Sequence, residues 1–278
     1  MPARPDPGGT RALAWLYCHA PQRPLLAALC SIEREIGASL LPNLDHQVAH
    51  ARLRWWREEC VRCAAGRPSH PLTRELGASL MPAALPALAG LVGLVDNAQW
   101  DLACASFGTR RELIRYCERW GSAMLEPLLR GTAPAVAAAA APALGASLRE
   151  LELLLALPAE ARAGRTRLPL DELERVQVGR AVLAQPPWPE GLAALVRERH
   201  RQLRGALGAS VAALAPAGPS AARGLIVWAA LSSSHSARAA RELPRARLTR
   251  EYHVPLDGWR AWRAARRAQA GDWQLRAD

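Results

Sequence analysis

Two arginines in a polar stretch of the chain are the residues best suited to bind a negatively charged ligand. Arg165 and Arg167 lie between Pro158 and Pro169, a segment that we expect to be a loop. The planar guanidinium group of arginine presents a fork of N–H donors that matches the oxygens of a phosphate group. These two side chains are therefore candidate diphosphate contacts, and the alternative is that they are solvated loop arginines.

Carboxylates and thiols are the next groups whose spacing could support chemistry. Asp96 and Asp101 are five residues apart and do not share a helical face well, so we expect a structural cap or an ion pair with an arginine for Asp101. Cys60 and Cys63 form a CxxC pair, but no second Cys or His pair stands at zinc spacing. Two thiols packed on one face of a helix are the simpler interpretation, and no metal is predicted there.

Nucleophilic catalysis finds little support in the sequence. The seven histidines are scattered, and we recognise no arrangement of a nucleophile, a histidine and an acid. The Ser232–His235 segment is small and polar within an expected helix, which favours close helix packing over a hydrolase site. The motifs GxSxG, GxGxxG and the P-loop are absent from the sequence.

Adjacent tryptophans flanked by arginines mark a possible partner surface. Trp55 and Trp56 point about 100° apart on a helix, so one is expected in the core and the other in a groove. The alternative is a surface for a protein partner of unknown identity, because exposed Trp and Arg side chains often anchor interfaces. Arg52 and Arg57 flank the pair and belong to the same candidate surface.

A second Trp/Arg segment lies near the end of the sequence. Trp259, Trp262 and Arg266 share one stripe of an expected helix, and the neighbouring stripe carries Arg260, Arg263 and Arg267. One interpretation has both tryptophans docked on the helical bundle with the arginines solvated. The other is attachment to an anionic membrane surface, where tryptophan favours the headgroup boundary and arginine is attracted by lipid charge.

The charge of the chain indicates an anionic partner only weakly. The net charge is +11, and all 36 basic residues are arginine because the sequence contains no lysine. Abundant Ala, Gly and Pro suggest that coding bias contributes to this composition. Without a nucleic-acid-binding motif, no nucleic-acid partner is expected.

The hydrophobic pattern predicts an all-α protein with one domain. Half of the residues are hydrophobic, Ala and Leu dominate, and apolar positions recur with helical periodicity. We interpret 133–143, an alanine tract with prolines, and 158–169 as connectors, and expect breaks at Pro82 and Pro86. The expected helices span 10–19, 25–41, 46–65, 72–80, 87–107, 109–126, 144–157, 170–176, 189–214, 220–242 and 258–269.

The predicted organisation is a flexible N-terminus over 1–10, a domain over 11–270 and a tail over 271–278. The first ten residues are polar and contain no apolar segment typical of a signal peptide. No apolar run reaches the roughly 18 residues of a membrane-spanning helix. A cytoplasmic protein, with a possible peripheral location on the inner face of the membrane, is therefore expected.

Three segments, taken in order, resemble the squalene/phytoene synthase family. They cover 21–59, 101–124 and 144–173, and the most specific part is GRTRLP at 164–169, which is similar to the GR-x-x-LP segment of that family. The resemblance implies an all-α isoprenoid synthase fold with a central cavity. It also implies an enzyme that joins two prenyl diphosphates head to head with Mg²⁺ held by two aspartate-rich motifs.

The positions at which the resemblance places the metal ligands have lost almost all of their carboxylates. Arg34 matches an arginine that precedes the first motif, and with Asp101, Arg165 and Arg167 it is a possible pocket or diphosphate contact. No aspartate occurs between residues 145 and 170, so the loss does not depend on the alignment register. The degenerate metal-motif positions are Gly37, Ala38, Leu41, Ala156 and Glu160.

These substitutions favour a member of the family without catalytic activity. The segments RLRWWREE and LLALPAEARAGR are similar to a non-catalytic branch that includes a mitochondrial complex I assembly factor and its bacterial relatives. The leading hypothesis is a binding or assembly protein without a metal cofactor, which would still accept a prenyl diphosphate-like ligand. The alternative is an active farnesyl or geranylgeranyl diphosphate transferase that uses Mg²⁺.

Overall fold

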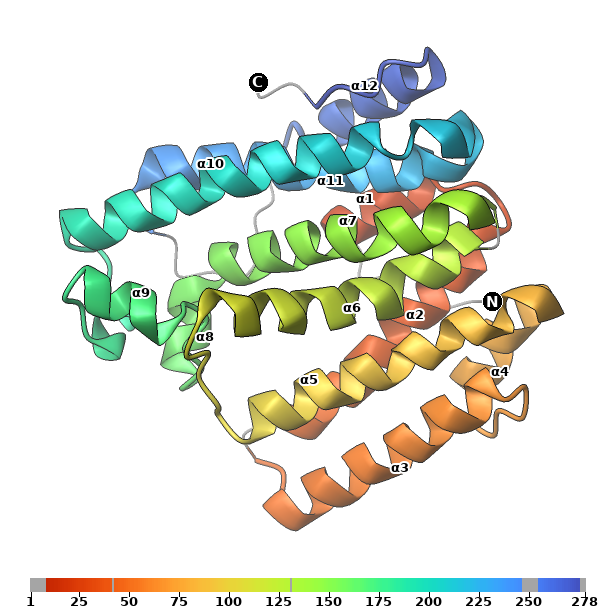
Figure 1. Cartoon of the computed structure of the whole chain (residues 1–278), viewed down its shortest axis with the longest axis horizontal. Helices are drawn as coiled ribbons and strands as arrows, with labels where there is room; N and C mark the ends of the chain where they lie inside the picture. Colours follow the sequence, from red (N-terminus) through yellow and green to blue (C-terminus); the bar gives the residue numbers. More distant parts are fainter. Residues whose placement is uncertain (1–8, 42, 131, 247–254, 276–278) are drawn as a thin grey trace.

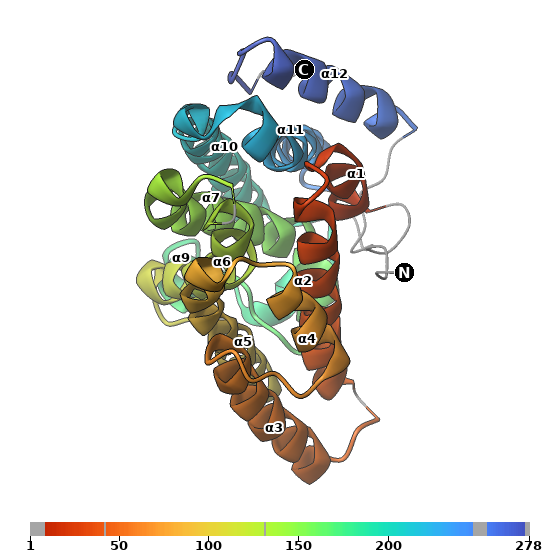
Figure 2. The ribbon, with the colours of Figure 1, turned by 90° about the vertical axis from the view of Figure 1, so that its right-hand side faces the viewer.

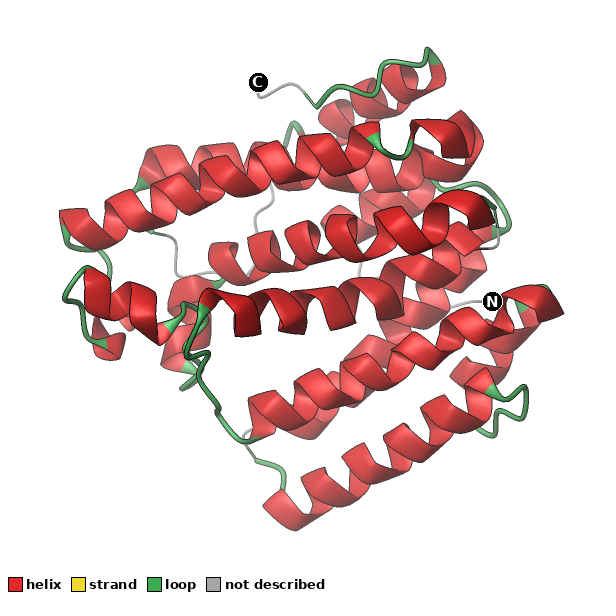
Figure 3. Ribbon diagram, viewed as in Figure 1, coloured by secondary structure: helices red, strands yellow, loops and turns green. Residues whose placement is uncertain are grey.

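The computed structural model describes residues 9–41, 43–130, 132–246 and 255–275, with the side chain of residue 220 excepted. Within these ranges the chain is helical and contains no strand (Figure 3). The all-α prediction is therefore confirmed. Of the expected flexible N-terminus, residues 1–8 lie outside the described residues, and the first helix already begins at Thr10. Of the expected tail, residues 276–278 lie outside the described residues.

Twelve α-helices lie in the described part of the chain, joined by short connections and four 3-10 segments. They are α1 (Thr10–Tyr17), α2 (Gln22–Gly37), α3 (His46–Ala64), α4 (Pro71–Ala78), α5 (Val92–Leu102), α6 (Arg110–Arg130), α7 (Pro134–Leu155), α8 (Leu157–Arg162), α9 (Leu170–Arg175), α10 (Glu190–Ala212), α11 (Gly218–Glu242) and α12 (Asp257–Gln269). The 3-10 segments are η1 (Ala38–Leu40), η2 (Pro82–Leu91), η3 (Arg180–Ala184) and η4 (Ala215–Ala217).

The helices are stacked around the central pair α6 and α7 (Figure 1). On one side of this pair lie α5 and then α3, and on the other lie α10, α11 and finally α12, which is the outermost layer (Figure 2). Helix α2 crosses behind the central pair and contacts α6. Segments of α2, α5, α6 and α7 line a common cavity within this stack.

Apolar stripes account for the central position of α6 and α7. Leu113, Tyr116, Trp120 and Met124 recur at helical spacing on α6, and each is at most 1% exposed. On α7 the leucines are buried on several sides, as expected for a helix with neighbours all around it. Burial of such faces supplies most of the stability of helices in a folded protein.

Several segments that the sequence predicted as breaks or connectors are helical. The alanine tract 133–143 forms the first half of α7, which continues through Pro142, and α6 continues through Pro127. Each proline removes one backbone donor, but the strong helix propensity of the flanking residues and burial against neighbouring helices outweigh that loss. The segment around Pro86 forms η2, and the predicted loop at 158–169 begins with α8.

The close approach of α6 and α7 depends on two glycines. A Cβ atom built on Gly145 of α7 would lie 2.1 Å from the Cα atom of Gly121 on α6. At this crossing, backbone packs directly on backbone, and no other residue type fits without displacing a helix.

None of the helices in the described part of the chain combines the length and the hydropathy that a transmembrane crossing requires.

Candidate functional site

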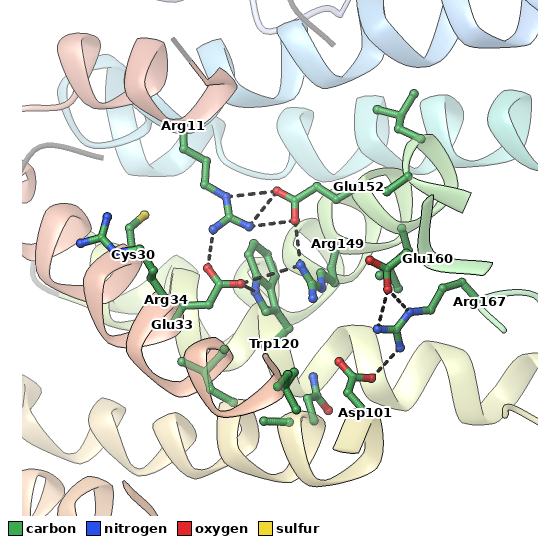
Figure 4. Close-up of a pocket in the computed structure, with 18 of the residues that line it drawn as sticks. Arg11, Cys30, Glu33, Arg34, Asp101, Trp120, Arg149, Glu152, Glu160 and Arg167 are labelled. Carbon is green, nitrogen blue, oxygen red and sulfur yellow. Dashed lines mark hydrogen bonds and ion pairs between the residues drawn. The ribbon is translucent and has the colours of Figure 1, made fainter. Parts of the chain in front are cut away.

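A cavity of about 680 Å³ lies between α1, α2, α5, α6 and α7 and extends to the loop after α8. Its lining combines apolar side chains with many charged ones, and Figure 4 shows the charged groups pointing toward one another across it. Arg34, Gly37 and Leu41 line the cavity and are also exposed, so its mouth opens beside the C-terminal end of α2.

Nearly all of the metal-motif and pocket residues predicted from the sequence meet at this cavity. Of the degenerate metal-motif positions, only Ala38 does not line it. The others come from two sides, with Gly37 and Leu41 at the end of α2, and Ala156 and Glu160 at the α7–α8 junction. The lining residues that the sequence identified are Arg34, Gly37, Leu41, Asp101, Ala156, Glu160, Arg165 and Arg167.

The first group of charged residues links α1, α2 and α7. The Arg11 guanidinium donates to both carboxylate oxygens of Glu152, at 3.0 and 2.8 Å from Nη2, and also pairs with Glu33. Arg149 approaches the same two carboxylates, at 3.1 Å from Glu152 and 3.7 Å from Glu33. Trp120 completes the group by donating its indole N–H to Glu33 at 2.7 Å. We call these five residues the arginine bridge.

Two tryptophan rings make cation–π contacts with the arginines of the arginine bridge. The Arg11 guanidinium carbon lies 5.2 Å from the ring centre of Trp120 and 5.3 Å from that of Trp228. Arg149 lies 5.6 Å from the Trp120 ring. Cation–π attraction at these distances adds to the ion pairs, so the two guanidinium groups are fixed on several sides.

The second group lies where α5, α6 and the loop after α8 meet. Arg167, only 4% exposed, donates to Asp101 at 2.6 Å and to Glu160 at 2.9 Å. Arg165 donates to the same Glu160 oxygen at 2.8 Å, and the Tyr116 hydroxyl donates to Asp101 at 2.9 Å. We call these five residues the Glu160 cluster. Neither arginine is simply solvated, and the predicted ion pair of Asp101 with an arginine is present.

Electrostatics keep one carboxylate in each group ionised. Burial alone would raise the pKa of Glu160, but hydrogen bonds and charges from Arg165 and Arg167 lower it to about 2. Burial likewise opposes the charge of Glu33, and the Arg11 and Arg149 charges lower its pKa nonetheless. Guanidinium groups of the chain itself therefore hold Glu33 and Glu160 as anions.

The lining residues do not fit a Mg²⁺ site of the kind that the family resemblance implies. Mg²⁺ requires several oxygen ligands in an octahedral arrangement. Gly37, Leu41 and Ala156 offer no side-chain oxygen, and Glu160 already accepts from two arginines. A search of the described residues finds no group of three or more His, Cys, Asp or Glu side chains that could hold a metal ion.

Sequence reasoning missed the whole arginine bridge. Arg11 lies 22 positions from Glu33 and 141 positions from Glu152, so no local motif indicates that these residues meet. One signal was available in retrospect. Glu33 and Glu152 each precede a degenerate position, Gly37 and Ala156, by four residues and so lie one helical turn away on the same face.

The predicted partner surface on α3 is smaller than the sequence indicated. Trp56 is 3% exposed and packs in the core, whereas Trp55 is 41% exposed, so the expected division between the two rings is present. Arg57 pairs with Asp96 of α5, and Arg52 lies 3.9 Å from Glu35 of α2. Trp56 therefore cannot belong to a partner surface. Of the two tryptophans in the predicted surface, Trp55 alone is exposed.

One histidine–acid pair that the sequence did not reveal joins α11 to α12. His235 Nε2 lies 2.9 Å from Asp257 Oδ2, and both side chains are buried. His200 Nδ1 on α10 lies 2.9 Å from the hydroxyl of Ser236. The Ser232–His235 segment is buried between helices, as expected for residues that permit close packing, although Ser232 and His235 also reach the cavity wall.

Comparison with known proteins gives the relatives of this fold. The family profile described as squalene/phytoene synthase matches residues 5–260. A dehydrosqualene synthase, crystallised in complex with a ligand, is 18% identical and superposes with a TM-score of 0.77 over 94% of this chain and 90% of that chain. Squalene synthase HpnC from Alicyclobacillus acidocaldarius is also 18% identical, with a TM-score of 0.64 over 83% and 88%. No curated protein matches the sequence significantly.

Proposed function

Because the chain belongs to the squalene/phytoene synthase family, we propose that it retains the family fold and cavity as a binding or assembly module without prenyl transfer. One observation carries this proposal. The cavity carboxylates are bridged by arginines of the chain, at the place where an active member would need them for metal ions.

The arginine bridge resembles a metal site in its electrostatic role. In a metal-dependent site, cations link carboxylates that come from facing helices. Here Arg11 links Glu33 of α2 to Glu152 of α7, and Arg149 stands between the same two carboxylates. An internal cation thus satisfies the negative charge of both helices, and a divalent ion would have to displace it.

Displacing these arginines carries a large free-energy cost. Breaking a buried ion pair leaves an uncompensated charge and costs about 3–5 kcal/mol. The arginine bridge is partly exposed, with side-chain exposures of 20–26%, so its cost lies below that range. The Glu160 cluster is more deeply buried, and there the full penalty opposes metal binding.

The persistence of the cavity supports a binding role. A volume of about 680 Å³ falls within the range of ordinary small-molecule sites, which are clefts of about 300–1,000 Å³. Its apolar lining on α5, α6 and α7 suits a hydrocarbon chain, and the charged groups that meet across it suit a polar head. A prenyl diphosphate-like molecule combines these two properties.

An assay of prenyl condensation tests the proposal. Purified protein is incubated with farnesyl or geranylgeranyl diphosphate and Mg²⁺, and products are identified by mass spectrometry. We expect no C30 or C40 product above a parallel reaction that contains a metal chelator.

The alternative function, an active transferase, predicts the opposite result. Product that the chelator abolishes, and that Glu160→Gln eliminates, would overturn the proposal. Glu198→Gln is the matched control, because Glu198 is an exposed carboxylate of α10 that pairs with Arg201 outside the cavity. The names of the two solved relatives, dehydrosqualene synthase and squalene synthase, make this the activity to test.

A further inference from the structure

A second hollow, of about 420 Å³, lies between α3 and α5, which run side by side (Figure 1). It shares no lining residue with the central cavity, so it is a separate feature of the molecule. Five residues of α3 and one of α5 line it, and we call it the α3–α5 groove. The lining consists of Gln47, His50, Ala51, Arg54, Arg57 and Gln99.

Every polar side chain in this lining can donate a hydrogen bond, and none of them is a carboxylate. The two arginines carry positive charge, and the imidazole and the two glutamine amides supply further donors. Gln47, His50, Arg54 and Arg57 follow one another at intervals of three or four residues, so they share one face of α3. A lining of this composition attracts an anion and disfavours a cation.

Arg54 differs from the other arginines of α3 in having no acidic partner. Arg52, Arg57 and Arg62 each pair with a carboxylate of the chain. Arg54 is exposed and forms no ion pair or side-chain hydrogen bond with any described residue. Its guanidinium group is therefore available to an anion that enters the groove.

Arg57 supplies a second guanidinium group that is already held in position. Its Nη2 atom donates to Asp96 and, at 3.1 Å, to the side-chain oxygen of Gln99, both on α5. A donor that is fixed before binding loses little conformational freedom when a ligand arrives. Because Asp96 compensates the charge of Arg57, the excess positive charge of the groove is that of Arg54.

We propose that the α3–α5 groove binds a phosphate monoester. The oxygens of a phosphate group match the donor fork of arginine, and the groove is larger than a phosphate group alone requires. A polar group esterified to the phosphate would reach the glutamine amides, which can both donate to and accept from its hydroxyl groups. Soluble phosphate esters and lipid headgroups with a terminal phosphate share this chemistry.

Two binding measurements on the full-length protein at physiological ionic strength test the proposal. Isothermal titration calorimetry uses glycerol 3-phosphate, and co-sedimentation uses vesicles of phosphatidylcholine with or without phosphatidic acid. We expect saturable binding that Arg54→Gln weakens about tenfold, because hydrogen bonds to charged groups are the stronger ones. Gln47→Glu should abolish binding, since it places a carboxylate in the groove. In the first turn of α3 an acidic residue favours the helix, so this variant should remain folded.

Arg175→Gln on α9 is the matched control. Like Arg54, Arg175 is exposed and has no ion pair with a described residue, and it lines neither the groove nor the central cavity. All three substitutions change the net charge by the same amount. The control should bind like the unmodified protein, and circular dichroism should show every variant folded.

The two probes also distinguish the sources of the phosphate. Binding of glycerol 3-phosphate alone would support a soluble ester, and binding of the phosphatidic acid vesicles alone would support a lipid headgroup. Three results would overturn the proposal. The first is that neither probe binds. The second is binding that Arg54→Gln and Gln47→Glu leave unchanged, which would place the anion elsewhere, as in the central cavity. The third is an equal loss in Arg175→Gln, because net charge alone would then drive association.

Discussion

Two regions of α7 meet the neighbouring helices in opposite ways. At the middle of the helix, Gly145 lies against Gly121 of α6 so closely that an added Cβ would sit 2.1 Å from a backbone atom. At the C-terminal end, Glu152 and the C-cap residue Ala156 face α2 across the cavity, and charged side chains fill the space between the helices (Figure 4). One helix thus contains both a packed crossing and an electrostatic one.

The contrast bears on the proposal that this chain keeps the family fold without prenyl transfer. The packed crossing sets the distance between α6 and α7 and tolerates almost no change of volume. Ion pairs link the helices at the electrostatic crossing, and there the proposal has arginines in the place of metal ions. We infer that the middle of α7 determines the fold and that its C-terminal end determines what the cavity accepts.

The packed crossing should show the largest response to substitution. Gly145→Ala forces backbone atoms apart, and overpacking of this severity should lower the free energy of unfolding by at least about 3 kcal/mol. Urea denaturation followed by circular dichroism measures the change.

The control for this substitution is Gly205→Ala in α10. Gly205 lies on the exposed side of the helix with open space around it, so added helix propensity should stabilise the protein by about 0.5–1 kcal/mol. Equal effects of the two substitutions would contradict a tightly packed crossing.

Acid should weaken the electrostatic side of the cavity selectively. The pKa of Glu160 is about 2 in the folded protein and about 4.5 in an unfolded chain, so the folded state binds fewer protons. Its stabilising contribution is therefore complete above about pH 4.5 and disappears as the pH falls toward 2. The size is on the order of 3 kcal/mol for this nearly buried carboxylate.

The difference in unfolding free energy between the unmodified protein and Glu160→Gln isolates this effect. That difference should be large at pH 7 and shrink between pH 4.5 and 2. His200, whose pKa burial lowers to about 3, also destabilises the protein in acid, but it does so equally in both proteins. A difference that does not vary with pH would contradict the assigned ion pairs.

The arginine bridge should give a smaller effect that depends on its partners. Arg11→Met leaves Glu33 and Glu152 facing each other with Arg149 alone between them. We expect the free energy of unfolding to fall by about 1–2 kcal/mol. Adding Glu152→Gln should restore part of this loss, because it removes a carboxylate charge that Arg11 no longer compensates.

Arg201→Met on α10 is the matched control for that cycle. Its ion pair with Glu198 is exposed, and surface pairs contribute little to stability, so this substitution should leave the free energy of unfolding nearly unchanged. Additive losses for Arg11→Met and Glu152→Gln would show that the two residues do not interact.

The fold was predictable from the sequence where local rules agree with burial. The stripe from Leu113 to Met124 on α6 and the Asp45 cap of α3, whose side chain accepts from two backbone N–H groups, follow from residue type and spacing. The prediction failed at Pro127 and Pro142, because the sequence shows a missing donor but not the neighbouring helices that compensate for it.

The site was predictable only in part, for a related reason. The family resemblance located the cavity positions Gly37 and Ala156, and the match of the family profile over residues 5–260 confirms that resemblance. The arginine that now links the two sides comes from α1, which carries no recognisable motif. Ion pairs between distant segments depend on tertiary structure, and one sequence alone does not reveal them.

The measurement that tests the central claim most directly is a titration with Mn²⁺, a paramagnetic substitute for Mg²⁺, followed by electron paramagnetic resonance. We predict that the protein leaves the signal of free Mn²⁺ unchanged. When farnesyl diphosphate is present, the signal should fall only by the amount of Mn²⁺ that farnesyl diphosphate binds in the absence of the protein. Gly37→Asp/Leu41→Asp/Ala156→Asp, which restores carboxylates around the cavity, should reduce the free signal. Stoichiometric Mn²⁺ binding by the unmodified protein, abolished by Glu160→Gln, would contradict the claim that arginines have replaced the metal ions.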